Sequence, residues 1–512
     1  MDFMPQGEGI ITTQMAYDQT QSNSPAQNET QKQPGSKTSH AFDYMSTFST
    51  CMSFAFGVIG ILGGVVFALN LTDLLELANI TILTAIGLSC VVGLLALLRK
   101  HYILTLTPMP FLLIAVFIYH CVGPFIYFLG NDYDIAYGDR FCVVTPLRLL
   151  RVNILVSVSL SILFCSHGFA LSRTREYFRH QPSIGHDSRV FRVLILYAIV
   201  GVGVQYGILF PAELGITSFN PPGLLTGTVF FTSLTVMMLF YLHVKNMLRF
   251  NAFTIAFVCL DFLHLILSCT KLGVIMHLSL IVFGIYLARP SKLLLVIFAL
   301  IMPYLYLVLV DYVIHSRTIQ NARVDSSFWL RLEIFTDYIL GNERNPVPEP
   351  EEELSGWWLR LNYAPPEAFA MREYDRGNPG DTFMLVIYSF VPRSLFPNKP
   401  IMTPGAKFNY LALGSDSSLS APGIFAEAYW NGGWILVGCT AIFVGALLAW
   451  FTAGTIQNSG RFDFVWLPCM FQSFLLGFRI DGWFSATYTA SVALVLVYYS
   501  MARLVLRLVE NN

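Results

Sequence analysis

The stretch LLLVIFALIMPYLYLVLVDYVI (293–314) is apolar over a length that can cross a lipid bilayer, and GWILVGCTAIFVGALLAWFTAGT (433–455) repeats the pattern. About 20 consecutive apolar residues form a helix that crosses a hydrocarbon core about 30 Å thick. Between the two stretches lie residues 315–432, which are polar and are called the insert below. We therefore expect two membrane-spanning helices joined by one large loop outside the membrane.

The composition of the whole chain also indicates a membrane protein. Hydrophobic residues make up 55% of it and charged residues only 12%, whereas a soluble domain carries about 25% charged residues. The sequence predicts an all-α polytopic membrane protein with about twelve transmembrane helices, three of them within residues 251–314. The expected spans are 48–69, 79–98, 103–129, 149–171, 190–210, 222–243, 251–269, 272–288, 293–314, 433–455, 463–478 and 483–505.

The Lys and Arg residues of the short loops predict the orientation. Cytoplasmic loops carry an excess of these residues. Here they gather in one set of alternate loops, whereas the opposite loops 70–78 and 211–221 contain none. The insert then faces outward, and both termini lie in the cytoplasm. The basic residues assigned to the cytoplasmic side are Arg99, Lys100, Arg173, Arg175, Arg179, Arg189, Arg192, Lys245, Arg249, Arg289, Lys292, Arg461, Arg503 and Arg507.

The chain divides into four parts. Residues 1–47 are rich in Gln, Ser, Thr, Asn and Pro and lack the features of a cleavable signal peptide, so we expect a disordered cytoplasmic tail. Residues 48–314 hold nine transmembrane helices, residues 315–432 form the insert, and residues 433–512 hold three more helices. None of the nine Cys lies in the insert, so neither a disulfide framework nor a metal site is expected. No nucleotide-binding or HExxH motif is present, and the net charge of −1 gives no reason to expect nucleic acid.

Arginine dominates the basic residues of the insert. Its planar guanidinium fork matches phosphate oxygens, whereas ion pairing with nearby carboxylates is the alternative explanation for each Arg taken singly. Together with Arg140, Arg148 and Arg151 of the outward loop 130–151, the group predicts two loops that clamp a lipid-linked diphosphate. The basic residues of the insert are Arg317, Arg323, Arg331, Arg344, Arg360, Arg372, Arg376, Arg393, Lys399 and Lys407.

Two further portions of the insert are distinctive. DTFMLVIYSFVPRSLFP (381–397) is too short to span and predicts a re-entrant or interfacial segment. Residues 355–377 place Trp, Tyr and Pro beside Arg. That pattern suits either a bound sugar or an amphipathic helix at the membrane surface.

Ionisable residues within the predicted spans are costly at membrane depth and are often functional. Asp261 and His264 lie three residues apart, which places them on one helix face, where they can hydrogen-bond each other. His120, His167 and Asp311 are similar cases. Two explanations stay open for these residues: polar contacts that hold helices together, and a proton relay.

Two segments resemble the signature of a known family. VPRSLFPNKPIMTPGAKFN (391–409) and APGIFAEAYWNGGWILVG (421–438) are similar to segments of O-antigen polymerases, the Wzy-type oligosaccharide repeat-unit polymerases. FRIDGWF (478–484) resembles the Arg-Gly-acidic segment of that family, with Ile480 where Gly is usual. The residues that fit the signature are Pro392, Arg393, Phe396, Pro397, Lys399, Pro400, Gly405, Phe408, Asn409, Glu427 and Gly433.

The resemblance implies a membrane-embedded glycosyltransferase with a GT-C-like fold and one large periplasmic loop containing short helices. Its substrate would be an undecaprenyl-diphosphate-linked oligosaccharide, polymerised on the periplasmic face of the bacterial inner membrane into O-antigen, capsule or exopolysaccharide. Arginines would stabilise the diphosphate without a metal or another cofactor. The implied partners are membrane lipid and a chain-length regulator and a flippase of the same pathway.

The implied reaction needs cations for the charge on the leaving diphosphate and a base for the attacking sugar hydroxyl. We expect catalytic roles for Glu427, Asp481 and Arg393, with Glu427 as the first choice for the base. Glu373 and His315 are further candidates for the base. The residues expected to bind substrate are Arg360, Arg372, Arg376, Lys399, Lys407, Arg479, Arg148, Tyr429 and Trp430.

Two other functions stay open. An O-antigen ligase would transfer a finished glycan from the same lipid carrier to a lipid A core, and it shares the many-span topology with one late outward loop. A flippase or transporter would show internal repeats and a binding site at mid-membrane. This chain shows no repeat and concentrates its polar residues in the insert. The run from Pro392 to Pro400 favours the polymerase.

Overall fold

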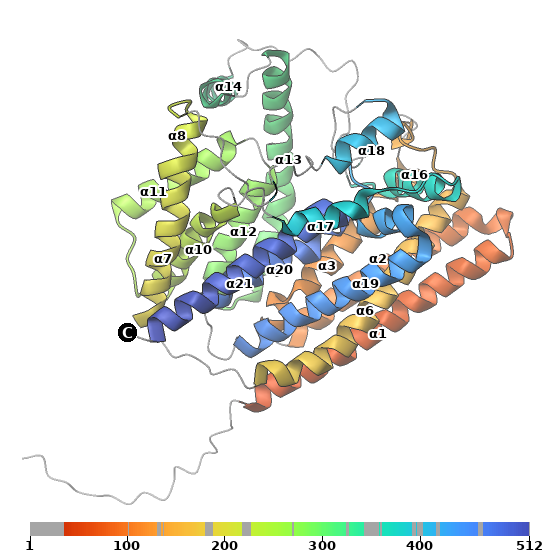
Figure 1. Ribbon diagram of the computed structural model, residues 1–512, viewed down its shortest axis with the longest axis horizontal. Helices are drawn as coiled ribbons and strands as arrows, with labels where there is room; N and C mark the ends of the chain where they lie inside the picture. The colour runs from red at the N-terminus through yellow and green to blue at the C-terminus, as the bar shows by residue number, and fades with distance from the viewer. Residues whose placement is uncertain are drawn as a thin grey trace, which may run out of the picture.

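The chain folds into helices throughout the described residues, and no β-strand is present among them (Figure 1). The computed structural model describes residues 35–100, 102–130, 135–136, 138–179, 188–217, 227–268, 271–323, 327–341, 358, 361–391, 396, 403–415, 420–458 and 464–510. In these ranges eight helices are long and apolar enough to cross a membrane, and three shorter apolar helices accompany them. By helix length and hydropathy the chain is a multi-pass membrane protein.

The α-helices fall before, within and after the insert. Those before it are α1 (Gly35–Ala68), α2 (Leu75–Lys100), α3 (Pro108–Phe117), α4 (Ile126–Leu129), α6 (Pro146–Arg179), α7 (Ser188–Val204), α8 (Phe210–Glu213), α10 (Phe230–Val244), α11 (Ala252–Leu267), α12 (Lys271–Ala288) and α13 (Lys292–Arg323). The insert begins with the last residues of α13. It also holds the whole of α14 (Phe328–Leu340), α16 (Ala364–Asp375), α17 (Leu385–Phe390) and α18 (Pro404–Leu413). The last part holds α19 (Ile424–Asn458), α20 (Leu467–Phe478) and α21 (Thr489–Glu510).

Short segments of tighter or wider helix join several of these elements. The 3₁₀ segments are η1 (Thr72–Leu74), η2 (Tyr102–Leu106), η5 (Thr382–Met384), η7 (Phe464–Trp466) and η8 (Arg479–Asp481). The π-helical segments are η3 (Ile118–Val122), η4 (Gln205–Leu209) and η9 (Phe484–Tyr488).

Eight of the twelve predicted spans coincide with helices that are long and apolar enough to cross a membrane, whereas α10, α11, α12 and α20, at the other four, are shorter than a full span. The division of residues 251–314 into three helices is confirmed by α11, α12 and α13. The described part of the predicted re-entrant portion 381–397 contains η5 and the short helix α17. Helix α16 is not a free surface helix, because one of its faces is buried against α19 and α6.

Helix α1 begins at Gly35, so the predicted disordered tail of residues 1–47 is helical in its last part. Phe42 and Met45 are buried there, and Nη1 of Arg175 on α6 lies 2.7 Å from Oδ1 of Asp43. Apolar burial and this ion pair extend the helix beyond the stretch that hydropathy alone marks. Residues 1–34 lie outside the described residues.

Helices α1, α6 and α19 lie side by side on one side of the molecule (Figure 1). His167 of α6 joins all three, because its Nδ1 lies 2.8 Å from Oγ of Ser49 on α1 and its Nε2 lies 3.1 Å from Oγ1 of Thr452 on α19. A Cβ at Gly445 of α19 would lie 2.3 Å from the carbonyl oxygen of Leu163, so only glycine permits this approach. His167 is therefore a packing residue, one of its two predicted roles.

Helices α7, α10, α11 and α12 form a second group on the other side, with α13 and α14 beside them (Figure 1). Helices α20 and α21 run between the groups. Phe230 and Phe231 of α10 contact the ring of Tyr498 on α21, with centroid distances of 6.0 and 5.1 Å. The two groups therefore share a packed interface and do not form separate domains.

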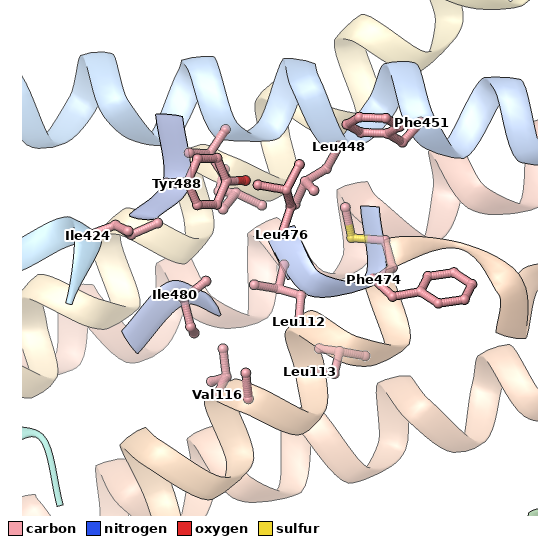
Figure 2. Close-up of a cluster of buried hydrophobic side chains, with 14 of the residues drawn as sticks. Leu112, Leu113, Val116, Ile424, Leu448, Phe451, Phe474, Leu476, Ile480 and Tyr488 are labelled. Atoms are coloured by element: carbon pink, nitrogen blue, oxygen red, sulfur yellow. The ribbon is translucent and has the colours of Figure 1, made fainter. Parts of the chain in front are cut away.

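A buried apolar cluster lies where α3, α19 and α20 meet (Figure 2). The rings of Phe111 and Phe474 stack with centroids 4.4 Å apart, and a Cβ at Gly477 would lie 2.5 Å from the carbonyl oxygen of Pro108. Ile480 belongs to this cluster and holds the η8 turn against it. The side chains labelled in the figure are Leu112, Leu113, Val116, Ile424, Leu448, Phe451, Phe474, Leu476, Ile480 and Tyr488.

Candidate functional site

Arg479 and Asp481, two of the predicted site residues, lie together in the η8 turn between α20 and η9. The hydroxyl of Tyr363, directly before α16, donates a hydrogen bond of 3.1 Å to Oδ2 of Asp481. Ile480 is 1% exposed, so the residue that departs from the family pattern anchors the turn in the core. Tyr119 of η3 is a further electrostatic neighbour of Asp481. We call Tyr119, Tyr363, Arg479 and Asp481 the Asp481 site.

Aromatic rings border the Asp481 site. The rings of Tyr119 and Tyr363 meet edge to face with centroids 5.1 Å apart, and Phe478 lies 5.7 Å from Tyr119. Both tyrosines, Arg479 and Asp481 are partly exposed. The site therefore brings a carboxylate, a guanidinium and aromatic rings within reach of a ligand.

The electrostatics of the Asp481 site favour a basic carboxylate. Burial raises the pKa of Asp481, and the hydrogen bond from Tyr363 and the charge of Arg479 oppose that shift. Burial lowers the pKa of Arg479, and Asp481 opposes that change. Burial and the nearby charge of Asp481 raise the pKa of Tyr363 well above its ordinary value, so its phenol keeps its proton and donates. A carboxylate with a raised pKa is a stronger base at neutral pH than an ordinary Asp.

Glu367 lies on α16, one turn after Tyr363, and is 1% exposed. Its Oε1 lies 3.7 Å from Nδ1 of His120 on η3. Within the described part of the chain, neither Oε2 of Glu367 nor Nε2 of His120 has a hydrogen-bond partner. Burial raises the pKa of Glu367 well above its ordinary value, which favours the protonated form. Sequence analysis missed Glu367, because a single Glu in a polar insert gives no sign of burial.

Glu427, the first choice for the base, is 0% exposed and its carboxylate accepts hydrogen bonds from two segments. Oε1 accepts from the Thr382 hydroxyl over 2.6 Å and from the Ser485 hydroxyl over 2.5 Å. Oε2 accepts from the backbone N–H groups of Phe484 and Ser485 over 2.5 and 3.3 Å. In this arrangement the carboxylate ties α19 to η5 and η9 and has no free face toward solvent.

Loop 130–151 and the insert meet at the side chain of Cys142. The Nη1 atoms of Arg148 and Arg372 lie 3.7 and 3.6 Å from its Sγ. The Nη2 atom of Arg151 lies 2.5 Å from Oδ2 of Asp375 on α16. The two loops that were expected to face outward and clamp one ligand are therefore in direct contact.

Positive charge exceeds negative charge at this contact. We call Arg148, Arg151, Arg372 and Arg376 the arginine cluster. Glu373 pairs with Arg372 at 3.1 Å and with Arg376 at 3.4 Å, while Asp375 pairs with Arg151. Asp139 is a third nearby carboxylate, whose pKa burial raises. Four guanidinium groups thus face three carboxylates, and Arg148 makes its hydrogen bonds to a carbonyl oxygen and a sulfur.

The hydroxyl of Tyr429 adjoins the arginine cluster, because it donates a 3.0 Å hydrogen bond to Oδ1 of Asp375. Tyr429 and Trp430 are 5% and 3% exposed, so their rings pack in the core and offer no open face to a sugar. The remaining predicted residues are dispersed. Lys407 pairs with Asp381 on the surface at 2.6 Å. His315 packs against Tyr338 of α14 with 5.4 Å between ring centroids. Predicted residues outside the described part of the chain are Arg360, Arg393 and Lys399.

Each of the three π-helical segments lies beside a buried carboxylate. The η3 segment places His120 near Glu367, η9 supplies three of the hydrogen bonds to Glu427, and η4 supplies Gln205 and Tyr206 to Asp261. The wider turn of a π-helix re-aims a side chain within an apolar helix and is frequent at functional sites. Hydropathy does not distinguish a π-helical turn from an α-helical one, so these segments could not be predicted from the sequence.

Comparison with known proteins finds no matching family model, no matching curated protein and no matching solved structure. The chain is a multi-pass, all-helical membrane protein. Among the described residues no three His, Cys, Asp or Glu side chains are placed to share a metal ion. The Asp481 site and the arginine cluster are therefore the features of the chain that indicate a function.

Proposed function

We propose that the chain is a membrane glycosyltransferase that polymerises oligosaccharides carried on a lipid diphosphate. The supporting observation is that α16 joins two sites that each contain arginine. Tyr363 directly before this helix contacts Asp481, whose neighbour is Arg479, and Arg372 near its end belongs to the arginine cluster. The nine steps along the chain from Tyr363 to Arg372 correspond to a rise of about 14 Å along a helix axis. That length suits a short oligosaccharide held at both ends.

Two arginine-containing sites suit a polymerase because both of its substrates are lipid diphosphates. One carries the growing chain and the other carries the incoming repeat unit. A ligase uses a single lipid diphosphate, and its acceptor is a lipid A core. The arginine cluster, as a second site beside Arg479, is therefore the feature that favours a polymerase over a ligase.

In the proposed reaction a hydroxyl oxygen of the incoming repeat unit attacks the anomeric carbon of the growing chain. The bond between that carbon and the lipid diphosphate breaks, and the hydroxyl proton passes to the carboxylate of Asp481. Arg479 stabilises the charge on the departing diphosphate. The arginine cluster binds the diphosphate of the incoming unit. Tyr119 and Tyr363 position the sugar beside the carboxylate.

This function implies a location that we also propose. About twelve helices would cross a bacterial inner membrane in a GT-C-like arrangement. The end that carries α14, α16 and α18 would face the periplasm, and both termini would face the cytoplasm. The substrate would carry undecaprenyl diphosphate. A chain-length regulator and a flippase of the same pathway would act with it.

The test is the length distribution of surface glycan in a deletion strain complemented with wild type, Asp481→Asn, Arg479→Lys or Arg372→Ala. The matched controls are Asp73→Asn and Arg289→Ala, since both residues are exposed and lie outside the two sites. Membrane levels of every variant are measured by immunoblot. We expect single repeat units on the surface acceptor in the deletion strain and in Asp481→Asn, and wild-type length in both controls.

Three results would contradict the proposal. Long glycan chains stranded on the lipid carrier in the deletion strain would identify a ligase. Accumulation of repeat units on the cytoplasmic side would identify a flippase. Wild-type chain length in Asp481→Asn, at a normal membrane level, would remove Asp481 from the reaction.

A further inference from the structure

Three polar side chains from three helices of the second group lie in a row. Nδ1 of His277 on α12 lies 3.1 Å from Oγ of Ser233 on α10. Nε2 of the same ring lies 3.5 Å from Oδ2 of Asp261 on α11. The two ring nitrogens of one imidazole therefore face a hydroxyl and a carboxylate, which is the order of groups in a nucleophile, base and orienting-acid triad.

Further contacts hold the carboxylate of Asp261. Its Oδ1 accepts hydrogen bonds from the Tyr206 hydroxyl over 2.7 Å and from Nε2 of Gln205 over 3.2 Å. Neither its Oδ2 nor Nε2 of His277 has a hydrogen-bond partner within the described residues, and these two atoms lie 3.5 Å apart. Such a carboxylate favours the tautomer with the proton on Nε2 of His277, which leaves Nδ1 free to accept the proton of Ser233.

The remaining charged groups of this network lie beyond Gln205. Nδ1 of His264 is 3.2 Å from Nε2 of Gln205, so Gln205 separates His264 from Asp261 and the predicted direct bond between them is absent. Nε2 of His264 faces Glu213 at 3.2 Å, and Glu213 faces Arg331 of α14 at 3.9 Å. This outer branch ends in an ion pair and does not compete for the bond between His277 and Ser233.

Exposure separates the nucleophile from the other two groups. His277 and Asp261 are each 1% exposed, whereas Ser233 is partly exposed. Ser233 also lies in the first turn of α10, where the positive end of the helix dipole favours negative charge. A polar contact made only for packing needs neither an accessible hydroxyl nor this placement.

We propose that Ser233, His277 and Asp261 form a second catalytic site, which transfers acyl groups from carboxylic esters. Ser233 Oγ bonds to the ester carbonyl carbon while its proton passes to Nδ1 of His277. The ester C–O bond then breaks and the alcohol leaves with that proton. A water or a sugar hydroxyl next attacks the acyl-serine, its proton passes to His277, and Ser233 leaves with that proton as the acid or new ester is released.

The surroundings indicate the class of ester. Apart from Thr232, Thr235 and the polar groups that hold Asp261, the sequences FFTSLTVMMLFYLHV of α10 and KLGVIMHLSLIVFGIYLA of α12 are mostly apolar. An apolar acyl chain fits that environment, because burying a charged or strongly polar substrate there would be costly. The substrate class is therefore a fatty acyl ester of a lipid or of a lipid-linked glycan.

The test uses an alkyl fluorophosphonate, which forms a bond between serine oxygen and phosphorus as fluoride leaves. The purified full chain in detergent is labelled and the modified peptide is identified by mass spectrometry. We expect label on Ser233, none there in Ser233→Ala, and labelling of His277→Gln slower by roughly 100-fold. The control is Ser279→Ala. Within the described residues the Ser279 hydroxyl bonds to the Ile275 carbonyl of its own helix, so its loss should not change labelling.

A second measurement covers variants that fold poorly. Ser233→Cys keeps a side chain of similar shape, and His277 should convert it to a reactive thiolate. We expect iodoacetamide to alkylate position 233 at neutral pH at least about tenfold faster in Ser233→Cys than in Ser233→Cys with His277→Gln. Folding is checked by gel filtration. Equal alkylation rates, or no fluorophosphonate on Ser233 in the folded wild type, would overturn the proposal.

Discussion

The hydroxyl of Tyr363 donates a 3.1 Å hydrogen bond to Oδ2 of Asp481 and so ties the insert to the turn between α20 and η9. Tyr363 belongs to the polar insert, whereas Asp481 follows an apolar helix far later in the chain. The bond stabilises the ionised carboxylate, while burial raises its pKa. The position of α16 therefore determines how basic Asp481 is.

Tyr363→Phe should shift the pH dependence of chain elongation. The hydrogen bond from Tyr363 lowers the pKa of Asp481, so its loss raises that pKa further above the ordinary Asp value. Since the base must be ionised, the acidic limb of the rate profile should move to higher pH, by about one unit. The measurement is elongation rate against pH in membranes. Tyr410→Phe is the control, because Tyr410 is exposed. If the acidic limb of the pH–rate profile of Tyr363→Phe stays where it is in wild type, Asp481 is not the base.

Hydropathy predicted the helices well because the membrane requires long apolar stretches. Eight of the twelve expected spans coincide with helices of sufficient length and hydropathy, and the other four coincide with shorter helices. The signature segments were less informative about the site. Glu427 matches the family pattern, yet its four donors show a carboxylate that joins η5 and η9 to α19. Glu367 and Tyr363 were not predicted as site residues, because their contacts depend on how α16 packs. The packing of a short helix within a polar insert produces no hydrophobic periodicity that a single sequence would show.

Glu427→Gln should lower stability more than it alters chemistry. All four hydrogen bonds of the carboxylate are donated to it. The NH₂ group of Gln would replace one of the two accepting oxygens, so the groups that donate to that oxygen would lose their acceptor. Loss of hydrogen bonds to a buried charge costs about 1.5–3 kcal/mol each. We expect a lower melting temperature in detergent and a reduced membrane level. Thr382→Ala removes one donor and should give a smaller drop, and an inactive variant of wild-type stability would restore Glu427 as a base.

Glu367→Gln should make the fold more stable than wild type at alkaline pH. The pKa of Glu367 in the folded chain is raised well above its unfolded value by burial. For a group with a raised pKa the stabilising contribution is complete below the unfolded pKa and is lost as the pH rises through the folded pKa. Gln mimics the protonated acid and has no such loss. The melting temperature of the variant should therefore exceed that of wild type at alkaline pH and approach it at acidic pH. The exposed Glu76→Gln is the control.

Arg148→Ala and Arg372→Ala should each weaken binding of a lipid diphosphate. Both guanidinium groups reach Cys142 from different loops, and a charge-assisted hydrogen bond of about 1.5–3 kcal/mol corresponds to roughly 10- to 100-fold in affinity. Binding of a fluorescent polyprenyl diphosphate to protein in nanodiscs measures the effect. Affinity should also fall as salt rises. Arg289→Ala should bind like wild type, and unchanged binding in both cluster variants would remove the second diphosphate site.

Gly433→Ala should destabilise the chain through the kink in α19. Gly433 has φ of +61°, a conformation that residues with a side chain rarely adopt, and a Cβ there would lie 2.8 Å from the hydroxyl oxygen of Tyr374. Together the strain and the clash should cost about 1–3 kcal/mol. Gly438 lies in the same helix with open space at its Cβ position, so Gly438→Ala should be neutral or slightly stabilising. Melting temperatures of the two variants in detergent measure the difference. The kink separates the segment that carries Glu427 from the apolar part of α19. Equal stability of Gly433→Ala and Gly438→Ala would show that the helix continues through residue 433 without a kink.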